Sequence, residues 1–158
     1  MFLEKNMKGE SKMLKKLLVP TDGSDSAYKA IYYARDLLKH KIAEEVVILH
    51  VGPAIGENWG FYGLSKVDFE LKYQCVLDDA GKRILRLARE PFEKEGLPVE
   101  TVYLCGDLAE TIVNYAEEND FKAIIIGNKG FSKIAELLLG SVCDRVIRLA
   151  KIPVMVIR

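Results

Sequence analysis

A glycine-rich segment followed by a serine is the part of this sequence best suited to bind an anion. Gly127 and Gly130 follow an apolar run, and Gly140 and Ser141 come after nine intervening residues. Glycine allows positive φ angles and lets a ligand approach without meeting a Cβ atom. Main-chain N–H groups at such a turn, and at the start of the helix expected over 142–150, are donors that hold phosphate oxygens. The segment therefore predicts a phosphate-binding loop.

The same residues also have a purely structural interpretation. Gly127 and Gly130 would then form a tight turn, and Ser141 would cap the next helix, with Asp144 completing a capping box. The segment contains three glycines and a serine, which is more than a turn needs. This surplus favours the phosphate-binding interpretation.

The elements that must position this loop alternate between strand and helix, a pattern typical of a parallel sheet covered by helices on both faces. A chain of 158 residues with 49% hydrophobic residues suits a single α/β domain. Apolar runs predict a strand that leads into a turn at 17–22, and further strands at 43–51, 99–104, 123–126 and 152–157. Helical spacing predicts helices at about 25–38, 67–95, 107–119 and 142–150. Pro91 is expected to kink or interrupt the second of these helices.

The glycine pattern resembles that of the universal stress protein family, in particular its ATP-binding branch, whose motif is G-x2-G-x9-G-[ST]. Gly127, Gly130, Gly140 and Ser141 fit the motif at every position. Three further segments resemble the family's first, second and last strands, namely 17–22, 46–51 and 152–157. Residues 1–12, which lack the apolar segment of a secretory signal, are interpreted as a flexible tail, and the resemblance implies a universal stress protein domain at 13–158.

This resemblance implies a three-layer sandwich with a five-stranded parallel sheet of order 3-2-1-4-5, a Rossmann-like fold of the adenine nucleotide alpha hydrolase type. In such open sheets ligands bind beyond the carboxyl ends of the strands, where the strand order reverses. For this order the reversal lies between the first and fourth strands. The Pro20-Thr21-Asp22 turn should therefore meet the glycine-rich loop at one crevice.

The resemblance also implies that the ligand is an adenine nucleotide, ATP or else AMP or ADP, bound with Mg2+ or Mn2+. Pro20, Thr21 and Asp22 would line the adenosine side, Val51 would bond the adenine edge through its main chain, and Ile126 would pack on the base or ribose. The residues expected around the phosphates are Gly127, Gly130, Gly140, Ser141 and Val142.

Some residues near the motif are harder to interpret. Cys143 stands where the family often has threonine, which removes a hydroxyl donor, and Leu108 stands where the family usually has proline. Lys129 and Lys133 either attract phosphates or are simply solvated. His50, at a strand end, is more typical of a structural residue than of a general base.

These features favour a nucleotide-dependent regulatory switch in the stress response. No catalytic residue is predicted, because the sequence lacks a G-x4-G-K-[ST] P-loop and an arginine placed by a motif. A slow or partner-stimulated ATPase is an open alternative. So are a nucleotide-free dimeric interaction module of the same fold and a flavodoxin-like electron carrier with FMN.

Composition narrows the partners and the compartment. Lys plus Arg and Asp plus Glu each total 23, so the net charge offers no long-range attraction to nucleic acid or an anionic membrane. The three scattered cysteines, the lack of a membrane-length apolar run and the absence of a secretory signal predict a cytoplasmic protein.

The segment 154–157 is expected at the sheet edge, which favours a homodimer through that strand. The loop 53–65 is interpreted as a flap, a plug or a contact for an unknown protein partner.

Overall fold

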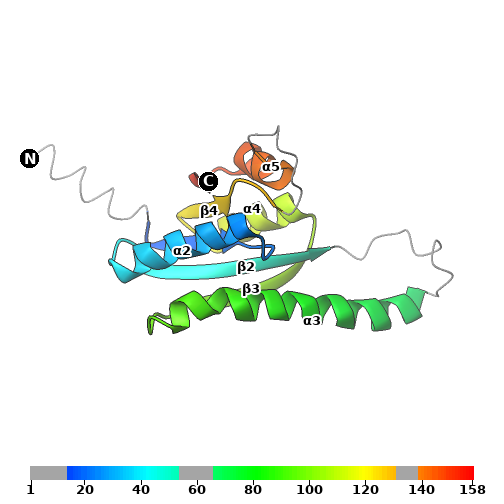
Figure 1. Ribbon diagram of the computed structural model, residues 1–158. Coiled ribbons are helices and arrows are strands. Elements are labelled where there is room, and N and C mark those ends of the chain that lie inside the picture. Colours follow the sequence, from blue (N-terminus) through cyan, green and yellow to red (C-terminus); the bar gives the residue numbers. More distant parts are fainter. Residues whose placement is uncertain (1–13, 54–65, 131–138) are drawn as a thin grey trace, which may run out of the picture.

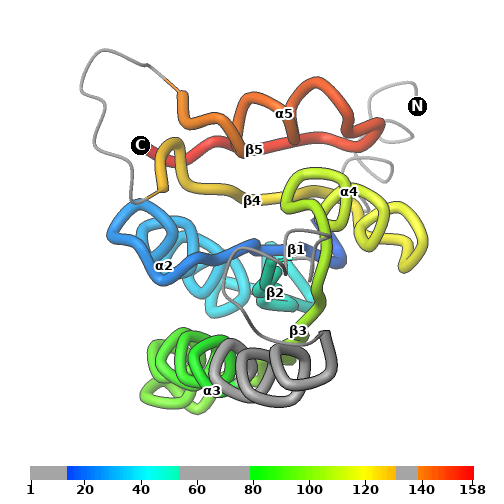
Figure 2. Tube along the Cα trace, turned by 90° about the vertical axis from the view of Figure 1, so that its right-hand side faces the viewer, coloured from blue at the N-terminus to red at the C-terminus, as the bar shows by residue number. Residues whose placement is uncertain are grey.

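The computed structural model describes residues 14–53, 66–130 and 139–158, with side chains described from residue 79 onward in the second range. Five parallel strands form one sheet in the order β3-β2-β1-β4-β5 (Figures 1 and 2). The strands are β1 Lys16–Pro20, β2 Glu45–Pro53, β3 Glu100–Gly106, β4 Ala123–Gly127 and β5 Val154–Ile157. The helices are α2 Asp25–Lys39, α3 Lys66–Glu93, α4 Leu108–Glu118 and α5 Ser141–Leu149. The predicted fold class and strand order are confirmed.

Helices cover both faces of the sheet, because alternate strand residues point to opposite sides. α2 and α3 pack on the face that carries Leu17, Val19 and Ile125. α4 and α5 pack on the face that carries Leu18 and Ile124. Figure 2 shows the two helix layers on either side of the strands, which are stacked from β5 to β3. This arrangement is the three-layer sandwich expected from the sequence.

α2 and α4 begin with a side-chain cap, whereas α5 does not. The Ser24 hydroxyl accepts a hydrogen bond from the Ala27 N–H at the start of α2, and the Asp107 carboxylate caps α4 in the same way. The N-cap of α5 is Gly140, which makes no side-chain cap bond. Its carbonyl accepts the first helical hydrogen bond, from the Asp144 N–H at 2.9 Å. The interpretation of Ser141 as a cap is therefore wrong, because Ser141 is already inside the helix.

Several element ends differ from the sequence-based expectation. β2 and β3 pair as far as Pro53 and Gly106, so each of these two strands ends later than its apolar run predicts. Pro91 does not interrupt α3, which continues to Glu93. The residue after this proline, Phe92, is fully buried in the core. The interpretations of the tail 1–12 and of nearly all of the loop 53–65 fall outside the described residues, as does that of Lys133. Among the helices described, none is both long and apolar enough to cross a membrane.

Candidate functional site

A pocket of about 230 Å³ lies at the carboxyl ends of β1 and β4, where the strand order reverses. Its lining includes every residue predicted for the site, namely Pro20, Thr21, Asp22, Val51, Ile126, Gly127, Gly130, Gly140, Ser141 and Val142. The fold therefore brings the turn after β1 and the glycine-rich segment after β4 to one place. Their role in binding a nucleotide stays a prediction.

The turn after β1 is fixed by a set of local hydrogen bonds. The Thr21 N–H donates to the Leu49 carbonyl at 2.8 Å, which ties the turn to β2. The Thr21 hydroxyl accepts from the Gly23 N–H at 3.2 Å, and Asp22 Oδ1 accepts from the Ser24 N–H at 2.9 Å. Only one carboxylate oxygen of Asp22 is used in this turn, so the other can face the pocket.

Gly127 and Gly130 lie close to other groups of the site. A Cβ atom on Gly127 would lie 2.5 Å from the main-chain oxygen of Ser26, so α2 packs directly against this glycine. A Cβ atom on Gly130 would lie 2.8 Å from Asp22 Oδ2. The second carboxylate oxygen of Asp22 therefore faces the glycine-rich segment across a narrow space.

Both ends of the glycine-rich segment are held in place by hydrogen bonds. The Ser26 hydroxyl donates to Asn128 Oδ1 at 2.9 Å and accepts from the Lys129 N–H at 3.2 Å. The Gly140 N–H donates to the Asn128 carbonyl at 2.7 Å. Sequence reasoning missed Ser26 and Asn128, because they are 102 positions apart and no local pattern links them.

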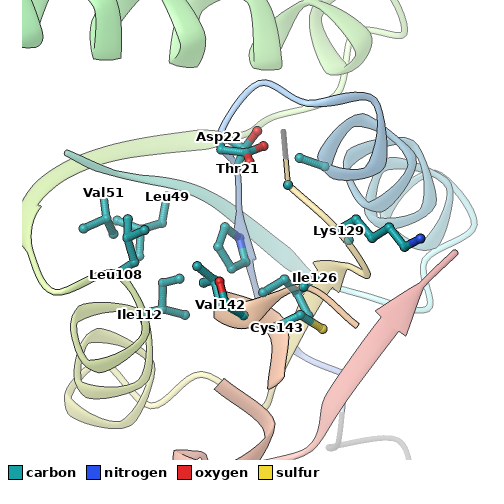
Figure 3. A pocket seen from close by; sticks show the side chains of 16 residues that line it. Thr21, Asp22, Leu49, Val51, Leu108, Ile112, Ile126, Lys129, Val142 and Cys143 are labelled. Carbon is teal, nitrogen blue, oxygen red and sulfur yellow. The ribbon is translucent and has the colours of Figure 1, made fainter. Parts of the chain in front are cut away.

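The opposite end of the pocket is apolar. Its side chains come from three elements and comprise Leu49 and Val51 of β2, Leu108 and Ile112 of α4, and Ile126 of β4. Figure 3 shows Leu108 beside Leu49 and Val51, with Ile112 nearby. Leu108 and Ile112 are four residues apart in α4 and so lie on the same side of the helix. That spacing is visible in the sequence, but it does not reveal that this side of the helix borders a pocket.

The main chain of Val51 faces the pocket end of β1. Leu49 directs its carbonyl toward Thr21, and in a parallel strand the N–H and C=O groups of every second residue point to the same side. The corresponding groups of Val51 therefore point to the side where β1 has already ended at Pro20. This geometry leaves a main-chain donor and acceptor of Val51 beyond the last paired residue of β1, where the pocket lies.

The start of α5 supplies the polar end with main-chain donors. The first N–H groups of a helix have no partner within the helix and carry its positive dipole end, and no side chain caps them here. Ser141 is exposed at this end, whereas Cys143 is buried. Burial raises the pKa of the Cys143 thiol, and the Asp144 carboxylate raises it further. The thiol therefore stays protonated at neutral pH and adds no negative charge near an anion.

The charged side chains in the described lining are Asp22 and Lys129, so this lining carries no net formal charge. In Figure 3 the amine of Lys129 points away from the apolar side chains. Within the described residues, no group of three or more His, Cys, Asp or Glu side chains could hold a metal ion. The polar groups that the described lining offers to an anion include main-chain N–H groups, the Ser141 hydroxyl and the Lys129 amine.

His50 holds the turn after β1 from outside the pocket lining. Its Nδ1 lies 2.8 Å from the Thr21 carbonyl, which can only accept, so Nδ1 carries the proton and donates. The imidazole ring stacks on Tyr103 with ring centroids 5.7 Å apart. His50 is not part of the pocket lining. This geometry is that of a structural residue that holds the turn after β1.

Comparisons with known proteins agree with this architecture. The model of the universal stress protein family matches residues 13–158. Universal stress protein YxiE of Bacillus subtilis is 36% identical over 149 residues, covering 92% of this chain and all of that protein. Universal stress protein MJ0577 of Methanocaldococcus jannaschii is 33% identical over 94% of this chain and 97% of its own length.

Solved structures show the same fold. The structure of MJ0577 superposes with a TM-score of 0.76 at 32% identity, covering 92% of this chain and 96% of that one. A universal stress protein solved in complex with cAMP gives a TM-score of 0.65 at 27% identity, covering 91% of this chain and 97% of that one.

Proposed function

Because the chain belongs to the universal stress protein family, we propose that it binds an adenine nucleotide in this pocket and acts as a nucleotide-dependent regulatory switch in a stress response. The observation that carries the proposal is the division of the pocket into an apolar end and a polar end. A nucleotide has the matching division, since its base is flat and largely apolar whereas its phosphates are anionic. The cAMP complex of a 27% identical relative supports this choice of ligand class.

In this proposal the base lies at the apolar end. Val51 would bond the base edge through its main chain, and Ile126 would pack on the base or ribose. Pro20, Thr21 and Asp22 would line the adenosine. The phosphates would be surrounded by Gly127, Gly130, Gly140, Ser141 and Val142. The cluster of main-chain donors at the start of α5 would supply most of the attraction for the phosphates.

A Mg2+ or Mn2+ ion would fit beside Asp22. Its Oδ2 faces Gly130, and its Oδ1 is already engaged with the Ser24 N–H. Mg2+ is commonly held by one or two carboxylates together with substrate phosphates, so a single protein carboxylate is sufficient. The ion would neutralise phosphate charge next to a carboxylate that would otherwise repel the phosphates.

The pocket favours binding over rapid hydrolysis. Hydrolysis of a nucleoside triphosphate requires an oriented water and stabilisation of the charge on the transferred phosphoryl group. His50 donates to a carbonyl and stays outside the lining. We therefore assign no catalytic residue among the residues that the structure describes. Incubation with labelled ATP would show whether the protein is an ATPase that is slow or stimulated by a partner.

The first test is chemical analysis of the purified protein. A denatured extract should release an adenine nucleotide, or titration calorimetry should show ATP, ADP or AMP binding. If the crevice takes up no nucleotide at millimolar concentration, the proposal is wrong and the nucleotide-free interaction module takes its place. A yellow preparation that releases FMN would instead support an electron carrier.

The second test is Ser141→Ala. We expect about tenfold weaker nucleotide binding, because one hydrogen bond to a charged group contributes roughly 1.5–3 kcal/mol. The melting temperature should stay unchanged, since Ser141 is exposed and Gly140 is the N-cap. Ser24→Ala is the contrasting variant, because it removes a real cap and should cost about 1 kcal/mol of folding stability. Unchanged affinity in Ser141→Ala would contradict the placement of the phosphates.

A further inference from the structure

We infer that Leu108 is a specificity-determining residue, which covers the base of the bound nucleotide and so selects base-bearing ligands over inorganic phosphates. The inference rests on the proposed function and adds a residue that the family motif does not contain. Leu108 lines the pocket, yet 43% of its surface is exposed. A large apolar side chain that borders a pocket and is only half covered gains stability when a ligand covers the rest.

The neighbours of Leu108 form the apolar end of the pocket. Ile112, one helical turn further along α4, is only 3% exposed, and Val51 on β2 is only 6% exposed. Figure 3 shows Leu108 between these two buried side chains, and Leu108 is the half-exposed member of the three. A flat ring that enters this end of the pocket would therefore rest against buried side chains and cover the exposed part of Leu108.

The position of Leu108 relative to the phosphate end is fixed by an ion-pair network. Leu108 is the first residue of α4, directly after the N-cap Asp107. Asp107 Oδ1 accepts from the Glu110 N–H at 3.0 Å, and its Oδ2 accepts from Arg145 Nη1 at 2.9 Å. Arg145 belongs to α5, the helix that begins at Ser141. Asp107 therefore links the start of α4, which carries Leu108, to α5, whose first residues lie at the phosphate end of the pocket.

The two ends of the pocket should contribute independently to binding. The charged lining residues, Asp22 and Lys129, belong to the turn after β1 and to the glycine-rich segment, whereas the side chains around Leu108 are apolar. Removing the Leu108 side chain therefore takes away contact with the base and leaves the phosphate donors unchanged. The loss should appear for ligands with a base and not for a bare polyphosphate.

The experiment is titration calorimetry of the full chain with ATP and with inorganic tripolyphosphate, for wild type, Leu108→Ala and Leu149→Ala. Leu149 is the matched control, because it is the same residue type, is 44% exposed and is not part of the pocket lining. We expect Leu108→Ala to weaken ATP binding about fivefold, in keeping with the loss of roughly half a leucine's burial. Leu149→Ala should bind ATP like wild type, and neither variant should change the response to tripolyphosphate.

Leu108→Met provides a rescue, because methionine keeps most of the apolar volume and should retain wild-type affinity for ATP. Unchanged ATP affinity in Leu108→Ala would overturn the inference while leaving the proposed function intact. An equal loss of tripolyphosphate binding would also overturn it, since Leu108 would then support the pocket as a whole. Wild-type protein that binds no nucleotide would overturn the proposed function itself, and that failure is seen before any variant is compared.

Discussion

Gly127 and Gly130 belong to the same sequence motif, but a Cβ atom at the two positions would meet different kinds of groups. At Gly127 the obstacle to a side chain is the main-chain oxygen of Ser26, only 2.5 Å from where a Cβ atom would lie. At Gly130 the obstacle is the carboxylate oxygen of Asp22, which belongs to the pocket. The first glycine serves the packing of α2 on β4, and the second lies beside the pocket carboxylate of Asp22.

This difference predicts opposite outcomes for substitutions at the two glycines. Gly127→Ala should destabilise the fold by about 1–3 kcal/mol, because a main chain has to move to accept the methyl group. Gly130→Val should leave the melting temperature nearly unchanged and abolish nucleotide binding, because it fills the space meant for the phosphates. Thermal unfolding and calorimetry on both variants separate the two effects. Equal loss of stability in both would show that Gly130 is also a packing residue.

Sequence reasoning at this scale found the residues of the motif but not those that hold them. All the predicted site residues line one pocket. Ser26 and Asn128 escaped notice, because a hydroxyl that bridges distant segments has no periodic signature. Leu108 was noticed as an unusual residue, but its place at the edge of a pocket depends on how α4 packs.

At the scale of elements, the ends of α4 and α5 are linked by charge. The Glu110 N–H and the Arg145 guanidinium both hold the pKa of the Asp107 carboxyl below its ordinary value. The ion pairs of Arg145 with Asp107 and Glu110 are half exposed, so we assign them a positioning role more than a large share of the folding stability.

The lowered pKa predicts a specific pH dependence. Because the folded-state pKa lies below the unfolded one, the contribution of Asp107 to stability is present above about pH 4 and is lost as the pH falls through the folded-state value. Asp107→Asn keeps a good cap but carries no charge. Its stability should therefore fall less steeply in acid than that of wild type, as measured by urea unfolding at pH 7 and pH 3. Parallel curves for the two proteins would rule out this role of Asp107.

A second contact between elements links α3 to the turn after β1. A Cβ atom on Gly81 of α3 would meet the ring of Tyr103, and one on Gly52 of β2 would meet its hydroxyl. Tyr103 in turn stacks on His50, whose Nδ1 donates to the Thr21 carbonyl. The two glycines thus create the slot that holds Tyr103, and Tyr103 holds the histidine that supports the pocket turn.

Gly81→Ala tests this slot. In an exposed helix position the change would stabilise by about 1 kcal/mol, because alanine is the better helix former. Here we expect destabilisation, since the methyl group would displace the Tyr103 ring. In the background of Tyr103→Val the same change should become neutral or stabilising, which a double-mutant cycle of unfolding free energies would reveal. Stabilisation by Gly81→Ala alone would contradict this packing, because it would mean that the Tyr103 ring leaves space for the added methyl group.

At the scale of the whole molecule, the order of strands was predictable only by resemblance. The apolar runs predicted five strands and their parallel arrangement, and all five are present. Periodicity carries no information about which strands are neighbours, because β1 pairs with β2 and with β4 through segments remote in sequence. The strand ends were also set by pairing, as the extension of β2 and β3 to Pro53 and Gly106 shows.

The edge strand β5 remains our predicted dimer interface. The Ile124 N–H donates to the Pro153 carbonyl and the Asn128 N–H donates to the Ile157 carbonyl, so alternate main-chain groups of β5 face β4. Those of Val154 and Val156 therefore face the open edge. All four residues of β5 are partly exposed. A second copy of the chain could pair with this edge to form a two-fold dimer.

Val156→Lys tests that interface in solution. We expect light scattering to report a homodimer for wild type and a monomer for the variant, because a charge at the centre of the edge opposes pairing. Val102→Lys on β3 is the matched control, since it places the same substitution on the opposite edge strand and on the same face of the sheet. An unchanged mass for Val156→Lys would indicate that the edge does not associate.

The hydrogen bond between Gly140 and Asn128 has a consequence for how this protein can diverge. It closes the chain on itself just outside the sheet, and the Ser26 hydroxyl fastens this closure to α2 through Asn128 and Lys129. Doubling the length of a loop costs only about 0.6 kcal/mol in closure entropy, which is a small fraction of the stability of a domain. An insertion between Gly130 and Gly140 should therefore leave the fold intact, provided that Gly130 itself is retained beside Asp22.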